Sequence, residues 1–283
     1  MPPFGGGAAA TVLVQVVAVR VVSAPPAVLA GGLTPSARER DPFVSHREPI
    51  FNVPGVVLWL LATFFAVHFL RWVLPADQSK WLTEVLAFIP ARLGGFVADL
   101  PGGRIAAVTA FVTHQFVHGD LAHLLINLAW LLAFGTPVAR RTDPVRFLAF
   151  FLLTGIAGAL LYLAVNGGIP ILVVGASGAI SGLMGAAFRF LFSSAEDGGG
   201  LALAGARSTP LMPLADTLRD RRILIAVAGW TVLNVLLAWG GAGLTEAAGI
   251  AWEAHLGGFY AGLLLYGFFD RPAVIGDDAA PAE

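Results

Sequence analysis

Six stretches of the chain are almost entirely apolar, and short polar or charged segments such as Arg140 to Pro144 separate them. Each stretch meets or approaches the roughly 20 residues that an α-helix needs to cross a bilayer core about 30 Å thick. The stretches are approximately residues 52–74, 121–139, 146–166, 174–193, 223–241 and 250–269. The pattern predicts an all-α, polytopic membrane protein with a bundle of six transmembrane helices.

The connection between the first two predicted spans, residues 75–120, is long enough to hold structure of its own. Apolar residues recur in it at helical spacing, and Lys80 and Glu84 lie on other sides of the same stretch. A helix with one apolar face lies in the membrane interface with that face toward lipid. The pattern predicts such an interfacial helix, whose apolar stripe is Trp81, Leu82, Val85, Leu86, Phe88 and Ile89.

The two ends of the chain differ from the apolar stretches. The apolar run from Ala8 to Val19 is too short to cross a bilayer, and a Pro-rich stretch follows it. Residues 1–48 are therefore expected to be a flexible extension, with a signal-like segment or sequence upstream of the true start as open alternatives. Residues 49–271 form the predicted six-helix membrane domain. The acidic, Ala-rich residues 272–283 are expected to be a disordered tail.

The composition supports a lipid environment and excludes several kinds of site. Hydrophobic residues make up 57% of the chain and charged residues only 12%, which is outside the usual range of soluble globular proteins. The net charge of -1 implies no nucleic-acid partner. Because the chain has no cysteine, a disulfide framework, a thiol nucleophile and every Cys-based metal site are excluded.

Basic residues are distributed unevenly between the two sides of the predicted bundle. Cytoplasmic segments of membrane proteins retain an excess of Lys and Arg. With the amino terminus inside, the inner segments hold the basic clusters at 38–47, 140–146 and 219–222. The outer segments then hold Arg71, Lys80, Arg92 and Arg104. The bias predicts a multi-pass protein with both termini in the cytoplasm, in the plasma (inner) membrane.

Polar residues inside predicted spans are functional candidates because hydrocarbon penalises them. His123 and Asn127 lie four residues apart at the start of the second span, which places both on one face of a helix. Alternatively, Asn127 could form a hydrogen bond that joins helices, and His114 and His118 could hydrate the helix entrance. A metal site of the three nearby histidines is less favoured, because no carboxylate is placed to join it.

A second polar position, Ser177, stands between small residues in the sequence Gly175-Ala176-Ser177-Gly178. Small neighbours leave the hydroxyl accessible and allow other backbone to approach. The start of a helix also offers unpaired N–H groups that suit an oxyanion. The alternative is that Gly178 and Gly182 only pack helices together, because small residues four apart commonly do so in membranes.

The third candidate is His255, near the start of the sixth span. Gly258 and Gly262 follow it at the spacing that allows close packing of membrane helices. Contact between this glycine face and that of the fourth span would bring His255 toward Ser177. A serine hydroxyl is a weak nucleophile until a base takes its proton, and a neutral imidazole is such a base.

Together these motifs resemble those of the rhomboid protease family, over about residues 50–270. The resemblance rests on GxSG at Gly175 to Gly178, on AHxxG at Ala254 to Gly258, and on His118, His123 and Asn127 in the second span. Two positions depart from the family pattern. A Trp-Arg pair is missing from the segment Val108 to Thr113, and Ser181 replaces the tyrosine that stacks on the catalytic histidine of many members.

The resemblance implies an intramembrane serine endopeptidase that uses no cofactor or metal and cuts single-span transmembrane proteins near the outer membrane surface. Ser177 would be the nucleophile and His255 the general base. His123, Asn127 and the backbone N–H of Ser177 would form the oxyanion hole. His118 and the glycines at 175, 178, 258 and 262 would support the site. The alternatives are an inactive rhomboid-like protein that binds transmembrane partners, and a transporter, which internal repeats and mid-span acids would indicate.

Overall fold

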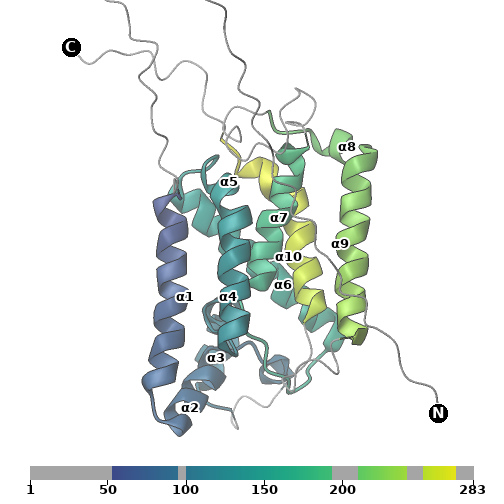
Figure 1. Cartoon of the computed structure of the whole chain (residues 1–283). Coiled ribbons are helices and arrows are strands. Elements are labelled where there is room, and N and C mark those ends of the chain that lie inside the picture. Colours follow the sequence, from purple (N-terminus) through teal and green to yellow (C-terminus); the bar gives the residue numbers. More distant parts are fainter. Residues whose placement is uncertain (1–52, 95–99, 193–209, 241–250, 272–283) are drawn as a thin grey trace, which may run out of the picture. The chain divides into compact units, whose positions relative to one another are not determined.

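The computed structural model describes residues 53–94, 100–192, 210–240 and 251–271, and these form an all-α bundle (Figure 1). The predicted fold class is therefore confirmed. The described residues contain no β-strand, only one isolated bridge between Phe88 and Val173. The predicted N-terminal extension and C-terminal tail, residues 1–48 and 272–283, lie outside the described residues.

Six helical segments correspond to the six predicted spans. They are α1 (Gly55–Val73), α4 with its continuation through the π-helix η3 and α5 (Leu121–Ala139), α6 (Pro144–Asn166), α7 (Ser177–Leu191), α9 (Arg221–Gly240) and α10 (Trp252–Leu265). The first three of these segments are, by length and hydropathy, able to cross a membrane. The shorter elements are α2 (Ala76–Leu86), η1 (Pro90–Gly94), α3 (Gly103–Thr113), η2 (His114–Phe116), α8 (Leu214–Thr217) and η6 (Tyr266–Phe268).

Aspartate side chains mark where α4, α6 and α9 begin. Asp120 accepts a hydrogen bond from the backbone N–H of His123 at 2.7 Å, and Asp143 accepts one from Arg146 at 3.0 Å. Each carboxylate satisfies a donor that has no partner inside its helix. Asp220 does the same before α9, accepting from the backbone N–H of Arg222, and hydrogen bonds from the Arg222 side chain lower the pKa of Asp220 to about 2.

The described part of the first connection contains two α-helices, where the sequence predicted a single interfacial helix. The helix α2 carries the predicted stripe as far as Leu86 and leaves Trp81 largely exposed. Phe88 and Ile89 are not part of it, because Ile89 precedes Pro90 and the residue before proline disfavours helical geometry. Phe88 instead pairs with Val173, and α3 follows as a second helix.

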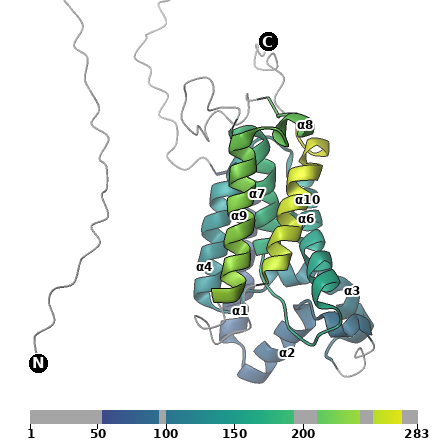
Figure 2. The same ribbon diagram turned by 90° about the vertical axis from the view of Figure 1, so that its right-hand side faces the viewer.

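The core of the bundle is α7. All its side chains except Ser177 and Phe188 are buried, and it contacts both α6 and α10. Figure 2 shows α9 and α10 in front of it. In contrast, only Ile223 and Asn234 are buried among the described side chains of α9. The candidate residue Ser177 therefore belongs to the most enclosed helix, at the end where α7 begins.

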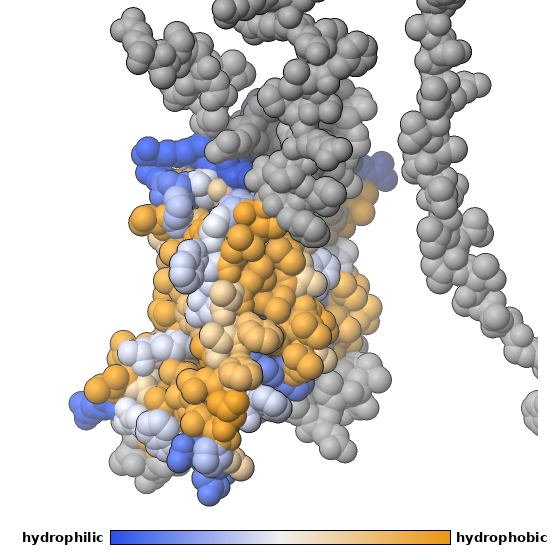
Figure 3. All heavy atoms as spheres, turned by 60° about the vertical axis from the view of Figure 1, so that its left-hand side comes forward, coloured by the Kyte–Doolittle hydropathy of each residue, from blue (hydrophilic) through white to orange (hydrophobic). Residues whose placement is uncertain are grey.

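The described surface is apolar over the middle of the bundle and polar toward its ends (Figure 3). Large apolar side chains point outward from α1, α4 and α9, and Trp59 is 76% exposed. A water-soluble protein rarely exposes such a continuous apolar surface, whereas lipid-facing helices require it. The bundle is that of an integral membrane protein.

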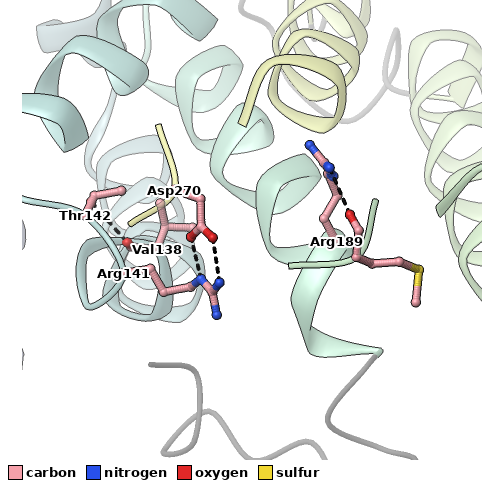
Figure 4. Close-up of polar contacts among 6 residues, drawn as sticks. Val138, Arg141, Thr142, Arg189 and Asp270 are labelled. Atoms are coloured by element: carbon pink, nitrogen blue, oxygen red, sulfur yellow. Dashed lines mark hydrogen bonds and ion pairs between the residues drawn. The ribbon is translucent and has the colours of Figure 1, made fainter. Parts of the chain in front are cut away.

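At the end of the bundle where α5 lies, an ion pair joins two distant segments (Figure 4). Arg141 donates from Nε and Nη2 to the two carboxylate oxygens of Asp270, each at 2.7 Å. The guanidinium group also stands 4.7 Å from the ring centroid of Phe190. This contact fixes the end of α10 to α5 and α7 at the end opposite to Ser177.

Candidate active site

Ser177 and His255, 78 residues apart in sequence, are in contact at one end of the bundle. The Oγ atom of Ser177 and the Nε2 atom of His255 are separated by 2.8 Å, a hydrogen-bond distance. Both side chains are only partly buried. The arrangement places a base within reach of the proton of a hydroxyl group.

The loop before α7 determines where the Ser177 side chain points. Gly175 has a φ angle of +120°, which L-residues with a side chain rarely adopt. Its backbone N–H donates to the carbonyl oxygen of His114 at 2.9 Å, which ties this loop to η2. The helix α7 starts at Ser177, so the hydroxyl group stands in the first turn, beside N–H groups that have no partner within the helix.

The position of His255 follows from close contact between α7 and α10. A Cβ atom added to Gly258 would lie 1.9 Å from the carbonyl oxygen of Gly178, and one added to Gly262 would lie 2.0 Å from that of Gly182. Both distances are shorter than any real contact, so only glycine allows this approach. The helix contact expected from the two glycine pairs is therefore present, and it carries His255 to Ser177.

His123, on α4, lies close to Gly175 in the loop before Ser177. Its Nε2 atom would be only 2.7 Å from a Cβ atom added to Gly175, and such a Cβ would be 3.8 Å from the hydroxyl oxygen of Ser177. The other ring nitrogen, Nδ1, accepts a hydrogen bond from the backbone N–H of Gly119 at 3.4 Å. A neutral imidazole carries one N–H, so the proton of His123 is on Nε2, the atom beside Gly175.

Asn127 and His118 complete the predicted set from the second span. Asn127 is buried, and its Nδ2 donates to the carbonyl oxygen of His123 at 2.8 Å, which leaves a second amide hydrogen. His118 is fully buried, and its ring packs edge-on against His123 with centroids 5.2 Å apart. The backbone oxygen of His118 accepts a hydrogen bond from Arg71 on α1. His118 therefore supports the ring of His123.

The two cavities beside α1 and α2, of about 660 and 600 Å³, are not lined by Ser177 or His255. The smaller of them reaches Gly119 and Asp120 at the entrance of α4. This cavity therefore lies on the α1 side of the α4 entrance, apart from the Ser177–His255 pair.

The sequence analysis missed one residue of the site, Asn234 on α9. Its Oδ1 atom is 2.8 Å from Nδ1 of His255, the ring nitrogen that faces away from Ser177. A polar residue in the middle of the predicted span 223–241 was the signal that could have identified it. No aromatic ring stacks on His255 among the described residues, and Ser181 is a small buried side chain in α7.

The groups thus form a line of hydrogen bonds that starts at Ser177, passes through His255 and ends at Asn234. The Nε2 atom of His123, next to Gly175, and the first N–H groups of α7 lie near the hydroxyl group. Chemically, the line can remove a proton from the hydroxyl group, and the N–H donors can stabilise negative charge on a neighbouring oxygen.

Comparison with known protein families identifies the family to which the chain belongs. The model of the Rhomboid domain family matches residues 106–272, which hold all the predicted site residues. No curated protein matches the chain. Members of the matched family are usually intramembrane serine proteases. Because the match covers more than half of the 283 residues, this chain is a member of the Rhomboid family.

Proposed function

We propose that this protein is an intramembrane serine endopeptidase with Ser177 as nucleophile and His255 as general base. The observation that carries the proposal is the 2.8 Å distance between Ser177 Oγ and His255 Nε2. A positioned base raises the rate of such a reaction by about 10²- to 10⁴-fold. The inactive alternative, a protein that only binds transmembrane partners, requires neither this distance nor a base at this position.

The proposed reaction is hydrolysis of a peptide bond in two stages. Ser177 attacks the scissile carbonyl group while His255 takes its proton, and the carbonyl oxygen becomes an oxyanion. The Nε2–H of His123, the second amide hydrogen of Asn127 and the backbone N–H of Ser177 stabilise that oxyanion. His255 then donates the proton to the leaving amine, and water, activated by the same base, releases the acyl group.

The proposed substrates are single-span membrane proteins. Peptide bonds in a transmembrane helix are engaged in internal hydrogen bonds, so small or helix-breaking residues near the cleavage point favour attack. The partly exposed dyad lies at the end of the bundle that holds α2 and α3. With both termini in the cytoplasm of a plasma membrane, this end faces outward, and we propose cleavage near the outer membrane surface.

Purified protein in lipid vesicles, incubated with a tagged single-span reporter, tests the proposal. We expect cleavage by the unaltered chain, and in Ser177→Ala or His255→Ala a loss of about 10⁶-fold, as in other serine proteases that lose one of these groups. Ser181→Ala is the matched control, because it removes a buried hydroxyl group one turn further along the same helix.

A fluorophosphonate probe gives an independent measurement, since it labels an activated serine without a protein substrate. The unaltered chain and Ser181→Ala should be labelled, and Ser177→Ala should not. Reporter binding without cleavage, together with no labelling of the unaltered chain, would favour the inactive binding protein. Undiminished cleavage by folded Ser177→Ala would remove the proposed dyad.

A further inference from the structure

The helix α9 buries few of its described side chains, and one of the buried ones is polar. Only Ile223 and Asn234 are buried among its described side chains, and Asn234, the polar one of the two, has 1% of its surface exposed. A buried amide in a membrane helix is costly unless its donor and acceptor are both engaged. The partners of Asn234 therefore indicate why it is there.

Both ends of the Asn234 amide have a partner. The Nδ2 atom donates to the carbonyl oxygen of Trp230 at 2.8 Å, and Oδ1 lies 2.8 Å from Nδ1 of His255. Because the carbonyl oxygen only accepts, the NH₂ group must face Trp230 and the oxygen must face the imidazole. An amide oxygen also only accepts, so the proton of this hydrogen bond belongs to Nδ1 of His255.

The proton on Nδ1 determines what the other ring nitrogen can do. A neutral imidazole has one N–H, so Nε2 of His255 presents a lone pair toward the hydroxyl group of Ser177, 2.8 Å away. This is the tautomer that a general base requires. Other nucleophile–base pairs also have a third group that orients the base, and an asparagine fills that role in cysteine proteases of the papain type.

We propose that Asn234 is the positioning residue of the dyad, which holds His255 in the Nδ1–H tautomer and stabilises the imidazolium ion that forms during attack. This inference rests on the proposed protease function. It also explains how Ser181 can stand where an aromatic residue was expected. The orientation of His255 comes from α9 through a hydrogen bond, rather than from α7 through a stacked ring.

A second contact between the same two helices supplies the control. Thr231 Oγ1 on α9 lies 2.8 Å from the hydroxyl oxygen of Tyr260 on α10, one turn from Asn234. This hydrogen bond joins α9 to α10 but does not involve the dyad. Thr231→Val therefore weakens the helix pair without changing the partner of His255.

Kinetics of reporter cleavage in vesicles test the role. We expect Asn234→Leu to lower kcat by about tenfold to a hundredfold, because a buried donor loses its acceptor, with little change in KM. Asn234→Asp, which keeps an acceptor oxygen, should restore part of that kcat. Thr231→Val should keep the kcat of the unaltered chain. If Asn234→Leu does not fold, Asn234→Ser, whose hydroxyl group stops short of His255, replaces it in the comparison.

The tautomer itself is visible by ¹⁵N NMR of protein labelled at histidine, with the His255 signals assigned by their loss in His255→Gln. The unaltered chain and Thr231→Val should show a protonated Nδ1 and an unprotonated Nε2, and Asn234→Leu should show a mixture of tautomers. If Asn234→Leu folds and keeps both the tautomer and the kcat of the unaltered chain, the positioning role is overturned. The protease proposal still stands in that case, provided that Ser177→Ala is inactive. Cleavage by Ser177→Ala would instead overturn the protease proposal.

Discussion

The α-carbon of Gly258 lies against the carbonyl group of Gly178, so close that a Cβ atom would stand 1.9 Å from the oxygen. Gly178 follows the proposed nucleophile directly, and Gly258 lies about one turn after His255. The contact therefore sets the separation of the two proposed catalytic side chains.

We expect Gly258→Ala to abolish most of the cleavage activity, because its methyl group must push α10 away from α7 and lengthen the Ser177–His255 hydrogen bond. The measurement is reporter cleavage together with the thermal unfolding temperature in detergent. Gly229→Ala, on α9, is the matched control, since a Cβ there meets nothing within 4 Å. It should leave activity unchanged and stabilise the helix by up to about 1 kcal/mol. Full activity in Gly258→Ala would show that the dyad does not depend on this contact.

The proposed oxyanion donors, His123 and Asn127, should matter for the rate more than for substrate binding. His123→Ala and Asn127→Ala are each expected to lower kcat by about 10²- to 10³-fold, because oxyanion donors act mainly in the transition state, while KM changes little. Steady-state kinetics with the vesicle reporter measure both constants. A rise in KM with unchanged kcat in either variant would assign that residue to substrate binding instead.

The ion pair between Arg141 and Asp270 is expected to stabilise the bundle without acting in catalysis. Both side chains are almost fully buried, with 0% and 4% of their surface exposed. Arg141→Ala should lower the free energy of unfolding by about 3–5 kcal/mol, because it leaves a buried charge without its partner. Arg146→Ala, which breaks a partly exposed pair with Asp143, should cost at most about 1 kcal/mol. Equal unfolding temperatures for the two variants would contradict this assignment.

Glu253, two residues before His255, is buried and accepts a hydrogen bond from Nδ2 of Asn166 at 2.8 Å. The bond fixes the start of α10 to the end of α6. Glu253→Gln keeps an acceptor oxygen and should retain activity and stability. Glu253→Leu removes one of the two acceptors of the Asn166 amide, the other being the carbonyl oxygen of Tyr162, and should destabilise the protein by about 1–3 kcal/mol. Thermal unfolding of the two variants, compared with that of Asn166→Leu, measures the contribution of the pair.

Most residues of the candidate site could be picked out in the sequence because they stand out in apolar surroundings. Ser177, His255, His123 and Asn127 are polar positions in or beside predicted spans, and hydrocarbon penalises such groups strongly. The glycines at 178, 182, 258 and 262 indicated which helices approach each other. Asn234 follows the same rule, but no motif surrounds it, so its partner could not be identified from its own helix.

Other features depended on contacts that a linear pattern does not contain. The helix α2 ends at Leu86, before Phe88. The predicted stripe could not show this end, because the apolar periodicity continues through Phe88 and Ile89. Phe88 pairs with Val173 from the loop before α7. The start of α7 at Ser177 likewise depends on Gly175, whose positive φ angle and hydrogen bond to His114 belong to the folded loop.

The sequence by itself determined the class of fold, the approximate spans and the chemical groups of the site, because each of these follows from local polarity and spacing. Only the tertiary structure decided which ring nitrogen of His255 faces Ser177. That choice depends on the hydrogen bond that Nδ1 of His255 donates to Asn234 on α9. The two residues come within 2.8 Å because α7, α9 and α10 pack together, and the order of residues along the chain does not contain this packing.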